Sequence, residues 1–105
     1  MTAESNTITL ALTHDELEPV RAILGQYGQG NSAFVFGSRV VASVEDQRRV
    51  KPYSDLDIAL AEPLLTLAQM DAMPEAFSES DLPMRVDIAI AADLPEEWKK
   101  RVWPL

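Results

Sequence analysis

Two stretches decide the fold: AFVFGSR, residues 33–39, and SDLDIALA, residues 54–61. The first is a short apolar run that stops at Gly37 and Ser38, which predicts a buried strand followed by a tight turn. The second sets Asp55 and Asp57 within an otherwise apolar run, which predicts a second strand. A buried strand has no structural need for such polar residues, so they are candidates for chemistry.

The remaining segments predict helices between these strands and one further strand. Thr13 to Glu16 match a capping box, so a helix is expected to begin at Thr13, with glycines ending it near Gly28. Residues 45–52 are polar and loop-like. The other expected elements are an extended segment at 8–12, a helix at 64–77, a strand at 84–91 and a C-terminal helix at 94–105. Apolar strands alternating with helices indicate an α/β (α+β) fold.

The composition excludes several classes of protein. The chain has 105 residues, a net charge of −8 and no cysteine, which excludes disulfide scaffolds, thiolate zinc sites and cysteine nucleophiles. The acidic charge repels a phosphate backbone, so no direct binding to nucleic acid is expected. No apolar run reaches membrane-spanning length and no signal peptide is evident. We expect a single cytoplasmic domain over residues 1–105.

Three acidic residues form the first candidate site. Alternate residues of a strand share a face, so Asp55 and Asp57 are expected to project side by side and to repel each other unless a cation lies between them. Mg²⁺ takes carboxylate oxygens together with substrate phosphates. Asp87 lies among apolar residues in the third expected strand, and it reaches the same site if that strand pairs with the second.

The turn after the first strand forms the second candidate site. Gly37 lets the backbone approach a ligand closely, and Ser38 offers a hydroxyl and an amide to an anion. Beside a metal held by carboxylates, this turn can hold a triphosphate. Phosphoryl-type transfer depends mainly on positioning and charge neutralisation, with Asp87 as a general base or a further metal ligand.

The ordered motifs FVFGSR, SDLDIAL and RVDIAI resemble the nucleotidyltransferase domain of the polymerase-β superfamily, and more narrowly the minimal nucleotidyltransferases (MNT proteins). The resemblance implies a small mixed sheet packed against helices. It also implies that Gly37, Ser38 and Arg39 bind the nucleotide. In this family, the residues matching Asp55, Asp57 and Asp87 bind Mg²⁺ and carry out catalysis. The connection over residues 39–54 is longer than is usual in the family.

The family resemblance also implies a biological setting. Such proteins are often encoded beside a helical HEPN protein, an RNase toxin, and some transfer AMP from ATP to a tyrosine of that toxin and so act as antitoxins. One alternative is an antitoxin that binds nucleotide and neutralises its partner by contact without catalysis. Another is an enzyme that modifies a small molecule, which the shortness of the chain disfavours. A hetero-oligomer or a homodimer is expected.

Three further features leave two interpretations each. Arg48, Arg49 and Lys51 form either a solvated loop tip or a lid whose cations meet phosphates or an acidic partner. Tyr53 either packs against the protein or stacks on a base. Of Trp98 and Trp103, one is expected in the core and the other exposed, and the exposed one either marks an interface or is an ordinary surface residue.

Overall fold

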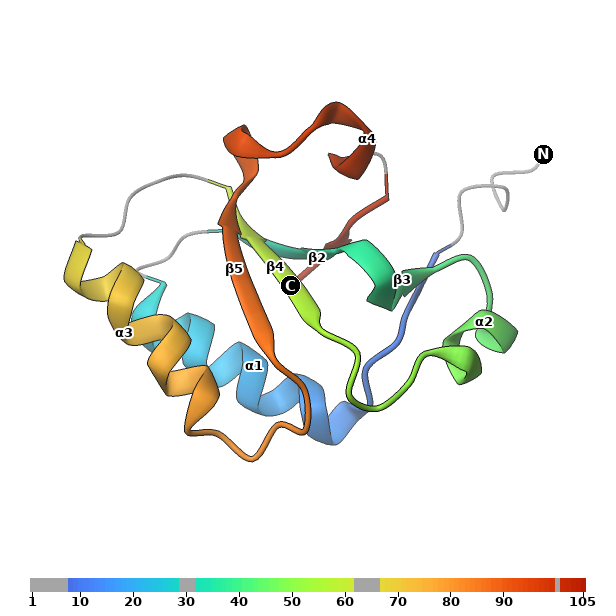
Figure 1. Cartoon of the computed structure of the whole chain (residues 1–105), viewed down its shortest axis with the longest axis horizontal. Coiled ribbons are helices and arrows are strands. Elements are labelled where there is room, and N and C mark those ends of the chain that lie inside the picture. The colour runs from blue at the N-terminus through green and yellow to red at the C-terminus, as the bar shows by residue number, and fades with distance from the viewer. Residues whose placement is uncertain (1–7, 29–31, 62–66, 100) are drawn as a thin grey trace.

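The chain folds into short strands and helices that alternate along the sequence (Figure 1). The computed structural model describes residues 8–28, 32–61, 67–99 and 101–105. In chain order the elements are β1 (Thr9–Leu10), α1 (His14–Tyr27), β2 (Ala33–Phe36), the 3₁₀ turn η2 (Gly37–Arg39), β3 (Val40–Val41), α2 (Val44–Arg49), β4 (Leu56–Leu60), α3 (Leu67–Ser78), β5 (Val86–Ile90), the 3₁₀ turn η3 (Ala91–Asp93), α4 (Glu96–Lys99) and β6 (Trp103–Pro104).

A four-stranded mixed sheet in the order β5-β4-β2-β6 positions the functional residues. β4 and β5 run parallel, whereas β2 is antiparallel to both of its neighbours. A separate antiparallel pair joins β1 to β3. Helices α1 and α3 lie side by side against one face of the sheet, and the segment with α4 lies over its other side (Figure 1). The predicted α/β class, with a small mixed sheet packed against helices, is confirmed.

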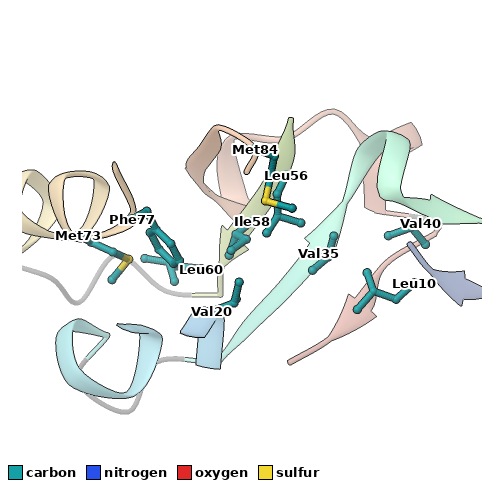
Figure 2. Close-up of a cluster of buried hydrophobic side chains, with 10 residues drawn as sticks. All are labelled: Leu10, Val20, Val35, Val40, Leu56, Ile58, Leu60, Met73, Phe77 and Met84. Atoms are coloured by element: carbon teal, nitrogen blue, oxygen red, sulfur yellow. The ribbon is translucent and has the colours of Figure 1, made fainter. Parts of the chain in front are cut away.

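The core lies between the sheet and the two longer helices (Figure 2). Alternate residues of β4 point toward α1 and α3, which leaves Asp57 on the opposite face. The residues that meet between the sheet and the helices are at most 3% exposed. From the sheet they are Val35, Leu56, Ile58 and Leu60, and from the helices they are Val20, Met73 and Phe77. The acidic candidates are therefore separated from the apolar core by the sheet itself.

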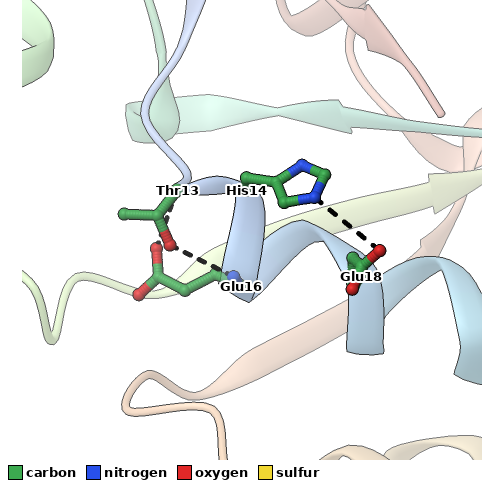
Figure 3. Close-up of polar contacts among 4 residues, drawn as sticks. All are labelled: Thr13, His14, Glu16 and Glu18. Atoms are coloured by element: carbon green, nitrogen blue, oxygen red, sulfur yellow. Dashed lines mark hydrogen bonds and ion pairs between the residues drawn. The ribbon is translucent and has the colours of Figure 1, made fainter.

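Helix α1 begins where the capping box predicts. The Thr13 backbone N–H donates to Oε1 of Glu16 at 3.0 Å, and the Glu16 backbone N–H donates to Oγ1 of Thr13 at 3.1 Å (Figure 3). The helix continues through Pro19 and ends at Gly28, whose N–H donates to the Leu24 carbonyl. Within the described residues, no helix combines the length and the apolar composition needed to cross a membrane.

The loop expected over residues 45–52 is wrong in its first half, which forms helix α2. The Ser43 side chain caps this helix by accepting from the Asp46 backbone N–H at 3.1 Å. Acidic residues lie in its first turn and basic residues in its last, an order that the helix dipole favours. The Gln47 side chain also donates to the Leu10 carbonyl at 2.9 Å. This tie to β1 favours an anchored surface segment over a lid.

The expected C-terminal helix over residues 94–105 is also wrong in its second half. Helix α4 ends at Lys99, and the chain returns as β6 along β2, where Trp103 is the register partner of Val35. The Leu105 N–H donates to the Ala33 carbonyl at 2.9 Å. The unpaired edge of β2 offers backbone hydrogen bonds that a helix could not use, and Pro104 is tolerated on an edge strand.

Candidate active site

Asp57 and Asp87 are brought together by the parallel pairing of β4 and β5. They are direct register partners, so both side chains project on the same face of the sheet from strands about 4.8 Å apart. Asp57 is also the register partner of Phe36, the last residue of β2. The pairing of the two strands, on which the expected approach of Asp87 to Asp57 depended, is therefore confirmed.

Asp55 lies just outside the strand in which it was predicted. β4 begins at Leu56, and Asp55 precedes it with an exposed side chain. Leu56 begins the strand by donating its N–H to the Arg85 carbonyl at 2.8 Å. Asp55 is nevertheless close enough to Asp57 for its charge to affect the titration of that residue.

Gly37 lies directly against the Asp57 carboxylate. Its φ of +82° is in the left-handed region, which only glycine adopts readily. A Cβ built at this position would lie 2.5 Å from Oδ2 of Asp57. The missing side chain therefore lets the Asp57 carboxylate pack directly against the backbone of the turn.

The carboxylates differ in how their charge is compensated. Burial, and then the charges of Asp87 and Asp55, raise the pKa of Asp57 above its ordinary value. Asp87 has a counter-ion, because Nε of Arg85 lies 3.3 Å from its Oδ1 in an exposed ion pair. Asp57 is thus the carboxylate that would gain most from an added cation.

The structure does not contain the three-carboxylate metal cluster that the sequence led us to expect. Among the described residues, no three His, Cys, Asp or Glu side chains are grouped so that they could hold a metal ion. Asp55 is exposed ahead of β4, and Asp87 is paired with Arg85. The pairing of Asp57 with Asp87 and the raised pKa of Asp57 still fit a hard cation with oxygen ligands that takes its remaining ligands from water and phosphate.

The Arg39 side chain has a different role from the phosphate contact expected of it. It is only 3% exposed. Its guanidinium donates to the carbonyls of Ser54 at 2.9 Å, Ala11 at 2.6 Å, Pro52 at 2.9 Å and Lys51 at 3.3 Å. With its N–H groups used in this way, Arg39 fixes the loop that leads to the acidic site, and the geometry does not support a contact with phosphate.

The C-terminal segment contributes residues that sequence reasoning did not assign to the site. Trp98 and Arg101 line a cavity together with Gly37, while Ser38 is exposed in the adjacent turn.

The predicted split of the two tryptophans is confirmed, since Trp98 is 45% exposed and Trp103 packs against the core. The spacing of the two tryptophans in the sequence does not predict that Trp98 lies beside Gly37. That position depends on the return of the chain as β6 along β2. Tyr53 is 76% exposed, so of its two interpretations the one in which it packs against the protein is wrong.

Comparison with known proteins identifies the family. No protein-family model matches the chain. A protein from Haemophilus influenzae named "Probable protein adenylyltransferase MntA" is 42% identical over 93 residues, which cover 87% of this chain and 75% of that protein. The identity extends over most of both proteins. The chain therefore belongs to the nucleotidyltransferase family that includes MntA.

Proposed function

We propose that this protein transfers AMP from ATP to a hydroxyl of a protein partner, a tyrosine of a HEPN-type toxin encoded nearby, and thereby acts as its antitoxin. The observation that carries the proposal is the register pairing of Asp57 with Asp87, with Asp57 against Gly37 at the edge of a cavity. The name of the Haemophilus influenzae relative, a probable protein adenylyltransferase, supports the choice of AMP and of a protein acceptor.

The chain's own residues divide the work of this reaction. The turn at Gly37 and Ser38 receives the phosphates, because Gly37 lines a cavity and Ser38 is exposed. Asp55 and Asp57 hold Mg²⁺, with Asp87 beside them. When bound, the ion neutralises charge on the triphosphate. Arg39 keeps the loop before Asp55 in place through its carbonyl contacts.

The transfer itself forms one bond and breaks one. The acceptor hydroxyl oxygen bonds to the α-phosphorus of ATP, the bond from that phosphorus to the bridging oxygen breaks, and pyrophosphate leaves. Asp87 takes the hydroxyl proton, and Arg85, 3.3 Å away, orients its carboxylate. Asp57 is less suited to this role, because its carboxylate lies against Gly37.

A labelling experiment tests the proposal. The protein is incubated with ATP labelled at the α-phosphate, Mg²⁺ and the product of the neighbouring gene. We expect label on the partner, and a loss of roughly 10²–10³-fold or more in Asp57→Asn and Asp55→Asn. Asp71→Asn, an exposed aspartate on α3, is the matched control and should retain full transfer. Chelation of the metal should abolish labelling by every variant.

A second candidate function is neutralisation of the partner by binding without catalysis. The observation that favours it is the ion pair with Arg85, which engages the carboxylate of Asp87. The same experiment distinguishes the two. Inhibition of the partner that is equal for the unmodified protein and Asp57→Asn, with no label transferred, would favour the binding function. Absence of any Mg²⁺-dependent binding of nucleoside triphosphate would contradict both.

A further inference from the structure

A small cavity opens beside Gly37, on the side of the C-terminal segment. It has a volume of about 150 Å³ and is lined by Gly37, Glu97, Trp98 and Arg101. Glu97 and Trp98 belong to α4, and Arg101 follows that helix. A cavity of this size has room for one small ring system, and the rest of a larger ligand would extend along Gly37.

Trp98 forms an aromatic wall of this cavity. Its ring packs edge-on against Phe36, with ring centroids 6.1 Å apart and an interplanar angle of 71°. The residue nevertheless remains 45% exposed, which is unusual for so large an apolar side chain. An indole that is held on one side and open on the other is a ready stacking surface for a flat ring.

Arg101 supplies an exposed guanidinium at the same cavity. The arginine expected to meet phosphate, Arg39, is buried and donates to carbonyls instead. Within the described part of the chain, the ion pairs include none formed by Arg101. A guanidinium presents paired N–H donors that match phosphate oxygens, so Arg101 is suited to the role that Arg39 does not fill.

We propose that this cavity is the nucleoside side of the nucleotide site, with the base stacked on Trp98 and Arg101 bound to the phosphates that pass Gly37. The Glu97 carboxylate faces the same space and accepts a hydrogen bond from a ribose hydroxyl. This inference rests on the proposed function, because it takes ATP as the ligand. It assigns the recognition of the base to α4, outside the three motifs that carry the chemistry.

Two probes separate the roles of Trp98 and Arg101 in binding. Dissociation constants are measured by calorimetry, in the presence of Mg²⁺, for ATP and for inorganic tripolyphosphate, which has no base. Trp98→Ala should weaken ATP about 10-fold or more and leave tripolyphosphate unchanged. Arg101→Gln should weaken both ligands by a similar factor. Trp98→Leu, which keeps an apolar contact with Phe36, repeats the first test if Trp98→Ala does not fold.

The controls use matched residues outside the cavity. Tyr53→Ala removes another exposed aromatic residue, and Arg21→Gln removes an exposed arginine on α1; both should bind ATP normally. In Trp103→Phe, Trp98 is the only tryptophan left, and its fluorescence should be quenched by ATP to saturation but not by tripolyphosphate.

The outcomes distinguish this inference from the proposed function. If the unmodified protein binds ATP or transfers AMP while both Trp98 variants and Arg101→Gln bind ATP normally, the inference is overturned and the proposed function stands. If Tyr53→Ala is the variant that weakens ATP, the base lies elsewhere and the inference again fails. If ATP binding depends on Trp98 but no acceptor is ever labelled, the inference stands and catalysis fails.

Discussion

Two charged centres lie close to the turn η2, and they are built in opposite ways. The Arg39 anchor, the guanidinium and its four carbonyl partners, is buried and donates four hydrogen bonds. Asp57 lies close to two other carboxylates, and burial together with these charges raises its pKa. Burial also lowers the pKa of Arg39, but the guanidinium stays protonated far above neutral pH. A satisfied charge stabilises a fold, whereas an uncompensated one is available to a ligand.

The largest expected effect on stability is at the Arg39 anchor. Arg39→Met should lower the free energy of unfolding by about 3 kcal/mol, because four carbonyls lose a charged donor inside the protein. Chemical denaturation measures the loss. Arg49→Met, on the exposed face of α2, is the control and should change the value by less than about 0.5 kcal/mol. An equal effect in the two variants would contradict the structural role of Arg39.

Gly37→Ala is expected to have the second largest effect on stability. Gly37 lies in the same turn as Arg39 and against the carboxylate of Asp57. The left-handed φ costs roughly 1–2 kcal/mol for alanine, and the contact between its Cβ and Oδ2 of Asp57 adds to that cost. Asp57→Ala should therefore relieve part of the destabilisation in the double variant. A double-mutant cycle on unfolding free energies measures the coupling. Strict additivity would mean that Gly37 does not lie against the carboxylate.

Asp57→Asn is expected to stabilise the protein at neutral pH while abolishing transfer. The pKa of Asp57 is raised in the folded state, so its ionisation destabilises the fold as the pH rises from about the ordinary value of 3.8 through the raised pKa. The gain at pH 7 should be up to about 1 kcal/mol and should disappear below pH 3.8. Thermal unfolding across pH measures it, with Asp71→Asn as the control. A variant less stable than the unmodified protein at pH 7 would show that the Asp57 charge is compensated.

Arg85→Gln should have the smallest effect. The Arg85 and Asp87 side chains are 77% and 45% exposed, and an ion pair open to solvent contributes less than about 1 kcal/mol. The change in melting temperature should also shrink as salt is added. A loss as large as that of Arg39→Met would place Asp87 among the structural charges and remove it from the catalytic ones.

Much of this site could be predicted from the sequence because its signals are local. The apolar run before Gly37, the alternation around Asp57 and the capping box at Thr13 each act over a few residues, and the structure confirms them. The approach of Asp87 to Asp57 was predicted only if the third expected strand pairs with the second, and the structure confirms that pairing.

The features that the sequence did not predict depend mainly on contacts between segments far apart in the chain. Nothing near Arg39 in the sequence shows that four carbonyls, one of them at Ala11, will surround it. The return of the chain as β6 depends on a free edge of β2, and the place of Trp98 beside Gly37 depends on that return. Helix α2 was missed because its stability comes from a cap and a tie to Leu10 and not from an apolar face.

The register of β4 against β5 also protects the site against misassembly. Leu56, Ile58 and Leu60 face the helices only when Asp57 faces away from them. A slip of one residue would drive a carboxylate into the apolar interior and turn leucines out to water. The chain therefore cannot gain the burial energy of its core without also placing Asp57 on the opposite face of the sheet, so folding itself fixes the face on which the carboxylates lie.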